Sequence, residues 1–353
     1  MPIRALLYVE HNYSFAILRP LQDEVRRRGG EACWFFAGNT ATPGYLQGDE
    51  KLLSSLTAVQ DWCPDVVFAP GNFISKSIPG LKVQVFHGLN SGKINRKGRP
   101  YHFEIRHCFD LYCTDGSAST ERFSKLQKKF KTFLVAETGW SALDPLFENS
   151  LENPYIDSSD ERKTVLFCST HSPRFSCAET IYEKIKSLSS TGKYRWLVQF
   201  HPKMRSQTVE KYKRLQSDNL SFVETDNVIP LIKAAEVMLC DTSSILVMFL
   251  LQHKPVVTFR NENPGDYLIN IESIEDIEPA LEKALDPPDE LIENIKIYGQ
   301  KMHPYRDGVS SARIVDAVEN ILSSGAAEQL KAKPLNLIRE YKERRKLASK
   351  SSE

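Results

Sequence analysis

Short apolar runs alternate with amphipathic stretches over residues 1–148, a pattern that predicts strands alternating with helices. The runs that read as buried strands are residues 3–9, 32–36, 65–68, 82–86, 111–114 and 133–136. Helical spacing follows the first of them over 15–28, with Pro20 as a kink, and the fifth up to about residue 129. This alternation is typical of an open, mostly parallel sheet with helices on both faces.

The same alternation restarts after a polar stretch, residues 148–162, which predicts a linker. The further strands are predicted at 164–168, 196–200, 220–223, 237–239 and 255–259, and the helices at 177–189, 228–235, after 244, and at 277–285, 291–301 and 311–322. We therefore expect two doubly wound, Rossmann-like α/β domains, 1–148 and 163–322, followed by a basic tail, 323–353. Two such domains facing a cleft resemble the GT-B type, and ligands would bind outside the carboxyl ends of the strands.

The most informative turn is Asp241-Thr242-Ser243-Ser244, between strand 237–239 and the apolar helix that leads to strand 255–259. Free N–H groups, hydroxyls and the positive end of a helix dipole would meet at such a turn, which favours a phosphate or diphosphate as ligand. Asp, Ser and Thr are also common helix caps that bind nothing, so an ordinary cap is the alternative interpretation.

Two histidines each follow an apolar strand directly, His87 in the first predicted domain and His201 in the second. Histidine suits general acid–base chemistry because its unperturbed pKa lies close to neutral pH. Lys93, Lys203 and Arg205 add positive charge nearby, where a phosphoryl group would bind. A purely structural role is the alternative for either histidine.

Four weaker candidates complete the predicted site. Thr170 and Arg174, in the polar loop after strand 164–168, offer a hydroxyl and a guanidinium to a nucleotide phosphate. Arg313 lies in the first turn of helix 311–322, for which Ser310 or Ser311 is the expected cap, and is predicted to reach the cleft. His11, in the first strand–helix turn, is predicted on the acceptor side. The remaining histidines show no metal-ligand spacing, so no metal is expected.

Composition narrows the class of protein. The chain has 353 residues, of which 41% are hydrophobic and 26% charged, and its net charge of +1 shows no bias toward nucleic acid. The seven cysteines include no C-x-x-C pair, which argues against a disulfide framework or a zinc site and fits a reducing cytoplasm. Neither a signal peptide nor an apolar run of about 20 residues is recognisable. The dinucleotide, P-loop and hydrolase-elbow glycine motifs are missing too.

The tail has a different character from the two predicted domains. Residues 331–353 hold eight Lys or Arg against three acidic residues, and Leu335, Ile338, Tyr341 and Leu347 have helical spacing. A basic amphipathic helix of this kind can lie on an anionic membrane surface. The alternatives are a solvated, frayed end or a helix that packs back on the other domain.

An ordered set of motifs connects the chain to a family. Along the sequence come His87-Gly88 with Lys93, Gly139-Trp140 with Asp144, Ser169-Thr170 with Arg174, His201-Pro202, Ala235-Glu236 through Asp241-Thr242-Ser243-Ser244 to Lys254-Pro255, and Asp307-Gly308 through Arg313 to Asp316. From about residue 83 to 320 this set resembles the CDP-glycerol glycerophosphotransferases, the teichoic-acid primase and polymerase family. Trp140-Ser141-Ala142 departs from the family's Y-P-R, and Thr242 replaces its tyrosine.

The resemblance implies a GT-B transferase that moves a polyol phosphate, such as glycerol phosphate, from a CDP-activated donor to a glycan or polymer hydroxyl. The family's two histidines implicated in catalysis correspond to His87 and His201, and its donor-phosphate turn corresponds to Asp241, Ser243 and Ser244. We expect teichoic-acid or capsule synthesis, with a cytoplasmic enzyme at the inner face of the membrane and an acceptor that is polymeric or lipid-linked. No cofactor is implied beyond the donor substrate. The alternatives are a glycosyltransferase that uses a nucleotide sugar, a non-hydrolysing epimerase, and a non-catalytic nucleotide- or glycan-binding protein.

Overall fold

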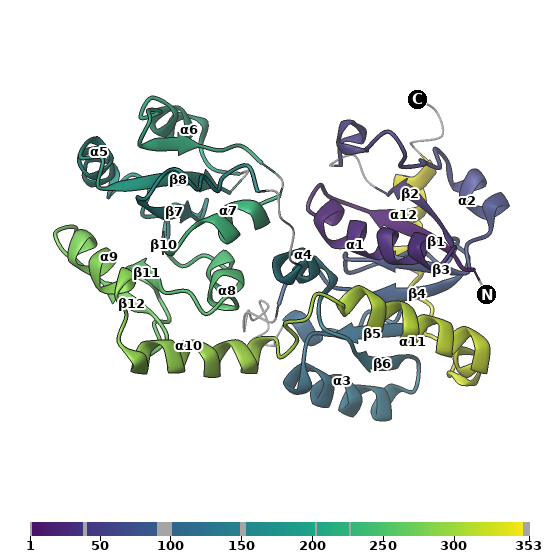
Figure 1. Ribbon diagram of the computed structural model, residues 1–353. Helices are drawn as coiled ribbons and strands as arrows, with labels where there is room; N and C mark the ends of the chain where they lie inside the picture. The colour runs from purple at the N-terminus through teal and green to yellow at the C-terminus, as the bar shows by residue number, and fades with distance from the viewer. Residues whose placement is uncertain are drawn as a thin grey trace. The chain divides into compact units, whose positions relative to one another are not determined.

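The computed structural model describes residues 2–37, 41–89, 101–148, 153–201, 203–225 and 227–348 (Figure 1). The chain divides into two compact units: unit 1 comprises Met1–Glu148 and His303–Glu353, and unit 2 comprises Asn149–Met302. Each unit is built on a six-stranded sheet whose paired strands are parallel. The predicted fold class, two doubly wound parallel-sheet units, is confirmed.

In the sheet of unit 1, the direction in which successive strands are added reverses at the first strand. Its strands are β1 (Arg4–Val9), β2 (Glu31–Phe36), β3 (Val66–Ala69), β4 (Leu81–Gln84), β5 (Leu111–Thr114) and β6 (Leu134–Glu137), in the order β2-β1-β3-β4-β5-β6. The chain runs from β1 to β2 on one side, and then continues with β3 on the other side of β1. The carboxyl ends of β1 and β3 therefore form the switch point, where sheets of this type bind ligands.

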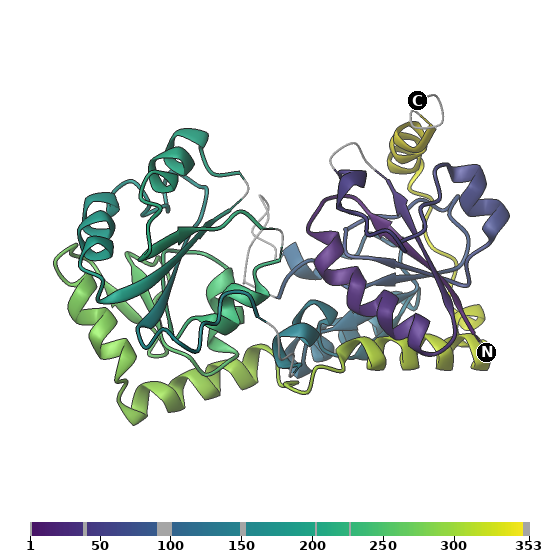
Figure 2. The same cartoon turned by 45° about the horizontal axis from the view of Figure 1, so that its top comes forward.

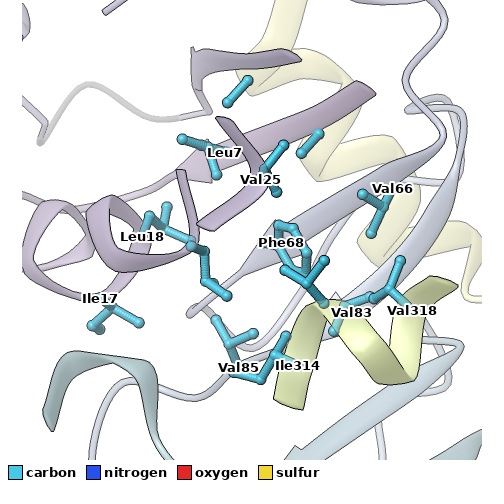
Figure 3. Close-up of a cluster of buried hydrophobic side chains, with 14 of the residues drawn as sticks. Leu7, Ile17, Leu18, Val25, Val66, Phe68, Val83, Val85, Ile314 and Val318 are labelled. Atoms are coloured by element: carbon cyan, nitrogen blue, oxygen red, sulfur yellow. The ribbon is translucent and has the colours of Figure 1, made fainter. Parts of the chain in front are cut away.

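Helices cover both faces of this sheet. One face packs against α1 (Ser14–Arg27) and α11 (Ser310–Ser324), the other against α2 (Leu56–Trp62), α3 (Ser117–Phe130) and α12 (Leu337–Ala348). Neighbouring residues of β1 point to opposite faces, as Leu7 and Leu6 do, because side chains alternate along a strand. Each face carries its own hydrophobic core: the first core lies against α1 and α11, and the second core lies against α2, α3 and α12. Figure 3 shows Ile314 and Val318 of α11 beside Val83 in the first core. The shorter elements of unit 1 are η1 (Pro43–Tyr45), η2 (Tyr101–Phe103), η3 (Ser141–Leu143), α4 (Asp144–Phe147) and η4 (Ala326–Gln329).

The predicted domain division placed residues 303–322 in the second domain, whereas helix α11 belongs to unit 1. The buried Asp144 carboxylate accepts the backbone N–H groups of Ser310, at 2.8 Å, and Ser311, at 2.7 Å. The expected cap by a serine of the helix itself is wrong, because the N-cap residue is Val309 and the carboxylate of Asp144 satisfies the first turn instead. With its apolar stripe buried against α1, the helix belongs to unit 1.

The basic tail also belongs to unit 1, as a helix that packs back. Leu347 of α12 is 1% exposed and joins the second core of the sheet. Glu340 accepts the backbone N–H of Lys76 at 3.0 Å and the hydroxyl of Ser75, and Lys333 forms an ion pair with Asp110. The connection between β3 and β4, residues 70–80, contains no helix. Helix α12 covers part of the face of the sheet that also packs against α2 and α3 (Figure 2).

Unit 2 repeats the same topological principle. Its strands are β7 (Lys163–Ser169), β8 (Tyr194–Phe200), β9 (Leu220–Phe222), β10 (Val237–Cys240), β11 (Val256–Phe259) and β12 (Ile269–Ile271), in the order β12-β11-β10-β7-β8-β9. Its helices are α5 (Tyr182–Ser190), α6 (Ser206–Lys213), α7 (Ile229–Ala234), α8 (Ile245–Leu250), α9 (Ile277–Leu285) and α10 (Asp289–Met302). The switch point lies between the carboxyl ends of β7 and β10, so the Asp241 turn is at the ligand-binding edge of this sheet.

Candidate functional site

His87 lies just beyond β4 and has a defined tautomer. Its Nδ1 lies 3.0 Å from the backbone oxygen of Pro70. A carbonyl oxygen only accepts hydrogen bonds, so Nδ1 carries the proton and Nε2 of the neutral ring keeps its lone pair. Buried Gln84 donates to the oxygens of Pro70, at 3.3 Å, and Gly71, at 2.5 Å, which fixes the carbonyl. His87 is therefore oriented as a proton acceptor through Nε2.

The backbone that leads into His87 is held in an uncommon conformation. Phe86 has φ = +56°, a value that residues other than glycine seldom adopt. The indole N–H of Trp140 donates to the Phe86 oxygen at 3.4 Å, and the His102 ring stacks on the Phe86 ring with centroids 4.6 Å apart. Trp140, which departs from the family pattern, thus supports the strand end that presents His87.

Trp140 is in turn fixed by His303, a residue that the sequence analysis did not single out. The backbone N–H of Trp140 donates to His303 Nε2 at 3.0 Å, and His303 Nδ1 lies 2.7 Å from the oxygen of Tyr305. His303 is 1% exposed, and burial lowers its pKa. It follows a predicted helix without any recognisable motif, so no sequence signal marked it.

The switch point of unit 1 brings His11 into the neighbourhood of His87. The ring centroids of His11 and Tyr13 are 5.3 Å apart, and those of Tyr13 and His87 are 5.6 Å apart. Glu10 lies so close to Gly71 that a Cβ atom at position 71 would be 1.5 Å from its Oε2. The turns after β1 and β3 therefore meet at Glu10 and Gly71, and polar and aromatic groups gather beside His87.

His201 follows β8 in unit 2 and has the opposite tautomer. Its Nδ1 accepts the backbone N–H of Lys203 at 3.0 Å. A backbone N–H only donates, so Nδ1 is unprotonated and the proton of the neutral ring is on Nε2. His201 is therefore oriented as a hydrogen-bond donor through Nε2, the role that a phosphoryl oxygen requires.

Asp241 differs from its predicted role as a phosphate ligand. Its carboxylate is fully buried and accepts the Ser169 hydroxyl at 2.5 Å and the backbone N–H groups of Thr170, at 3.0 Å, and Cys177, at 3.1 Å. Burial raises its pKa. Asp241 therefore ties the end of β10 to the loop after β7. Helix α5 begins at Tyr182, later than the predicted start at Cys177.

The rest of the predicted turn lies beside this buried carboxylate. Thr242 accepts the backbone N–H of Glu262 through its hydroxyl at 3.1 Å. Ser244 is the N-cap residue of α8 but makes no side-chain capping bond, so the expected cap is absent. Because α8 has only six residues, its dipole adds little, and any phosphate affinity of this turn rests on hydroxyls and N–H groups.

The positively charged side chains that were predicted to bind phosphate lie in different parts of the fold. Arg174 is 78% exposed and pairs with Glu262 at 2.9 Å. Lys203 and Arg205 are exposed just before α6. Arg313 lies on α11 in unit 1, so its predicted place in the donor domain is wrong. It pairs with Asp307, and its Cζ atom lies 4.2 Å from the centroid of the Tyr305 ring. Lys93 lies outside the described residues.

Two further properties concern the described ranges only. They contain no group of three or more His, Cys, Asp or Glu side chains arranged to hold a metal ion. None of their helices combines the length and the apolar character that crossing a lipid bilayer demands.

Two doubly wound parallel sheets with polar residues at their switch points agree with the GT-B class of fold. Residues 190–320 match the family model described as CDP-Glycerol:Poly(glycerophosphate) glycerophosphotransferase. The match confirms the predicted family resemblance over this segment, which contains His201 and the Asp241 turn. No curated protein sequence matches the chain.

Solved structures support the fold class. The wall teichoic acid polymerase TagF is similar with a TM-score of 0.66 and 14% identity, over 92% of this chain and 90% of that one. The S. aureus MnaA–UDP structure has a TM-score of 0.59 and 15% identity, over 94% and 99%. The structure of a UDP-N-acetylglucosamine 2-epimerase has a TM-score of 0.59 and 16% identity, over 95% of this chain and 99% of that one. At these identities the similarity establishes the fold alone.

Proposed function

We propose that this protein transfers a polyol phosphate, glycerol phosphate in the first instance, from a CDP-activated donor to a hydroxyl of a glycan or polymer in cell-surface polysaccharide synthesis. The observation that carries the proposal is the opposite tautomers of the two strand-end histidines, an acceptor at His87 Nε2 and a donor at His201 Nε2. The family match over residues 190–320 supports CDP-glycerol as the donor.

The two orientations suit the two halves of the reaction. His87 Nε2 takes the proton of the acceptor hydroxyl as its oxygen attacks the phosphorus that carries the polyol. The bond between this phosphorus and the bridging oxygen breaks, so the polyol phosphate becomes a phosphodiester and CMP leaves with the bonding electrons. His201 Nε2–H donates to a phosphoryl oxygen and stabilises the charge that develops there. His11 and Tyr13, beside His87, are proposed to contact the acceptor.

The donor phosphates are proposed to bind at the switch point of unit 2. Thr242, Ser243 and Ser244 follow β10, and Thr170 follows the neighbouring β7, where its backbone N–H donates to Asp241. Lys203 and Arg205 supply positive charge from the segment after β8. Arg174 is also proposed to contact phosphate, exchanging its pairing with Glu262 for the donor. Lys93 stays a predicted phosphate ligand outside the described residues.

The substitutions His87→Gln and His87→Ala test the assignment of the base. Loss of a general base lowers turnover by about a hundredfold to ten-thousandfold, while CDP binding to unit 2 stays unchanged. Product formation from CDP-glycerol measures the first quantity, and calorimetric titration with CDP measures the second. Unchanged turnover in both variants would show that His87 is not the base.

The finer location of the enzyme is proposed from the tail. Leu335, Leu337 and Tyr341 are 76%, 70% and 63% exposed, and Lys331 and Lys342 are exposed near them. Apolar side chains beside positive charge favour an anionic lipid surface, which would place the enzyme at the inner face of the membrane, close to a lipid-linked acceptor. Flotation with phosphatidylglycerol vesicles, compared with phosphatidylcholine vesicles, tests this. Equal flotation of wild type and a Leu337→Ser, Tyr341→Ser variant would contradict it.

A further inference from the structure

The ring of His171, another histidine of unit 2, lies directly against that of His201. The ring centroids of His171 and His201 are 4.3 Å apart, with an angle of 34° between the ring planes. The two residues come from neighbouring parallel strands, since Ser169 of β7 pairs with Phe200 of β8. The backbone N–H of His201 also lies 3.5 Å from the Ser169 oxygen. Both histidines are exposed at the ligand-binding edge of the sheet.

The position of His171 is built into the fold. Asp241 holds Thr170, the residue before His171, through its backbone N–H, and holds Cys177 at the far end of the same loop. A buried carboxylate with several donors is costly to disrupt, because any donor left unpaired loses its hydrogen bond without gaining water. The loop therefore carries the His171 ring to His201 at a fixed place, next to the turn that begins at Thr242.

We propose that His171 is a second phosphate-binding residue, which acts with His201 on the diphosphate of the nucleotide donor. This inference rests on the proposed function for the identity of the donor, but the phosphate site itself lies within unit 2. A pair of neighbouring imidazoles can direct two N–H donors at one phosphate group. The sequence motifs include His201 but pass over His171.

The test separates binding through the ring nitrogen from simple ring packing. His171→Phe keeps an aromatic ring against His201 but has no N–H, His171→Asn keeps a short polar donor, and His171→Ala removes both. His253→Asn is the matched control, because His253 precedes β11 at the opposite, amino-terminal edge of the sheet. Calorimetric titration with CDP, CMP and inorganic pyrophosphate gives the dissociation constants, and thermal unfolding checks that each variant is folded.

We expect His171→Phe and His171→Ala to weaken CDP and pyrophosphate binding about tenfold or more, the usual loss for a hydrogen bond to a charged group. His171→Asn should keep part of the affinity, and His253→Asn all of it. Wild-type affinity in His171→Phe would reduce His171 to a packing role and overturn the inference, as would a wild-type protein that binds neither CDP nor pyrophosphate. If binding depends on His171 but CDP-glycerol is not turned over, the proposed function fails and the phosphate site stands.

Discussion

Single hydrogen bonds set the chemical character of each candidate residue. The sequence predicts that His87 and His201 end strands, because each follows an apolar run. It cannot predict which nitrogen carries the proton, since that depends on the Pro70 oxygen in one case and the Lys203 N–H in the other. The same limit applies to Asp241, whose motif indicates a phosphate ligand, whereas its buried carboxylate accepts hydrogen bonds from Ser169, Thr170 and Cys177.

The substitution Asp241→Asn tests this assignment. Replacing one carboxylate oxygen by an NH2 group sets a donor against the donors of Ser169, Thr170 and Cys177. We expect the free energy of unfolding to fall by roughly 1–3 kcal/mol in urea denaturation, and CDP binding to weaken as the loop loosens. Asp266→Asn, at an exposed position, is the control and should change neither quantity. Unchanged stability in Asp241→Asn would contradict the assignment.

His303 makes the stability of unit 1 depend on pH. Burial holds its folded pKa below the ordinary 6.5, so the unfolded chain takes up a proton first as the pH falls. The contribution is nil well above pH 6.5, becomes destabilising as the pH drops through 6.5, and levels off below the folded pKa. In denaturation curves at several pH values, His303→Gln should lose less stability below pH 6.5 than the wild type. Equal slopes for the two proteins would exclude this role.

Helix α11 shows which properties of an element the local sequence pattern can predict and which it cannot. The amphipathic spacing of residues 311–322 predicts α11 within two residues at each end. The unit that it joins depends on Asp144, far away in sequence, and on the face of the sheet left uncovered beside α1. The short strand β12 and the helix α6 were not predicted, because three and eight residues carry little periodicity.

The substitution Asp144→Ala removes the acceptor at the start of α11. We expect unit 1 to lose about 0.5–2 kcal/mol of stability, the usual cost of a lost N-cap interaction. Denaturant titration measures the loss, and Asp61→Ala, at an exposed position on α2, is the control. A wild-type unfolding curve for Asp144→Ala would show that the cap does not hold the helix.

Leu347 tests whether the tail is part of the fold. It is 1% exposed in the second core, whereas Leu337 of the same helix is 70% exposed. Leu347→Ala should therefore cost about 2–5 kcal/mol, and Leu337→Ala much less. The comparison needs only the two unfolding curves, and equal effects would mean that α12 does not pack on unit 1 in solution.

The whole molecule consists of two units with separate hydrophobic cores, and the chain crosses between them twice. The sequence predicts two doubly wound domains because the alternation of strands and helices restarts after residue 162. The return of the chain to unit 1 at His303 was not predictable, since no linker composition marks it. Family resemblance places the motifs in order, and only the fold shows that Asp144 and the segment after Asp307 meet in one unit.

Cysteine reactivity probes the integrity of both units at once. Six of the seven cysteines are buried, and Cys63 is exposed. A thiol reagent should therefore label one cysteine rapidly in the native protein and seven after denaturation, counted by mass spectrometry. Cys63→Ser should remove the rapid label. Rapid labelling of Cys168, Cys177 or Cys240 in the native protein would contradict the packing around Asp241.

The most direct measurement of the central claim is turnover of the wild-type protein with a panel of donors. CDP-glycerol, CDP-ribitol and nucleotide sugars are each supplied with a poly(glycerol phosphate) acceptor, and released nucleotide and new phosphodiester bonds are quantified by chromatography and phosphorus NMR. We expect CMP release from a CDP-polyol, with one phosphodiester formed for each CMP. Release of UDP from a nucleotide sugar, or binding of CDP-glycerol without CMP release, would contradict the proposed transfer.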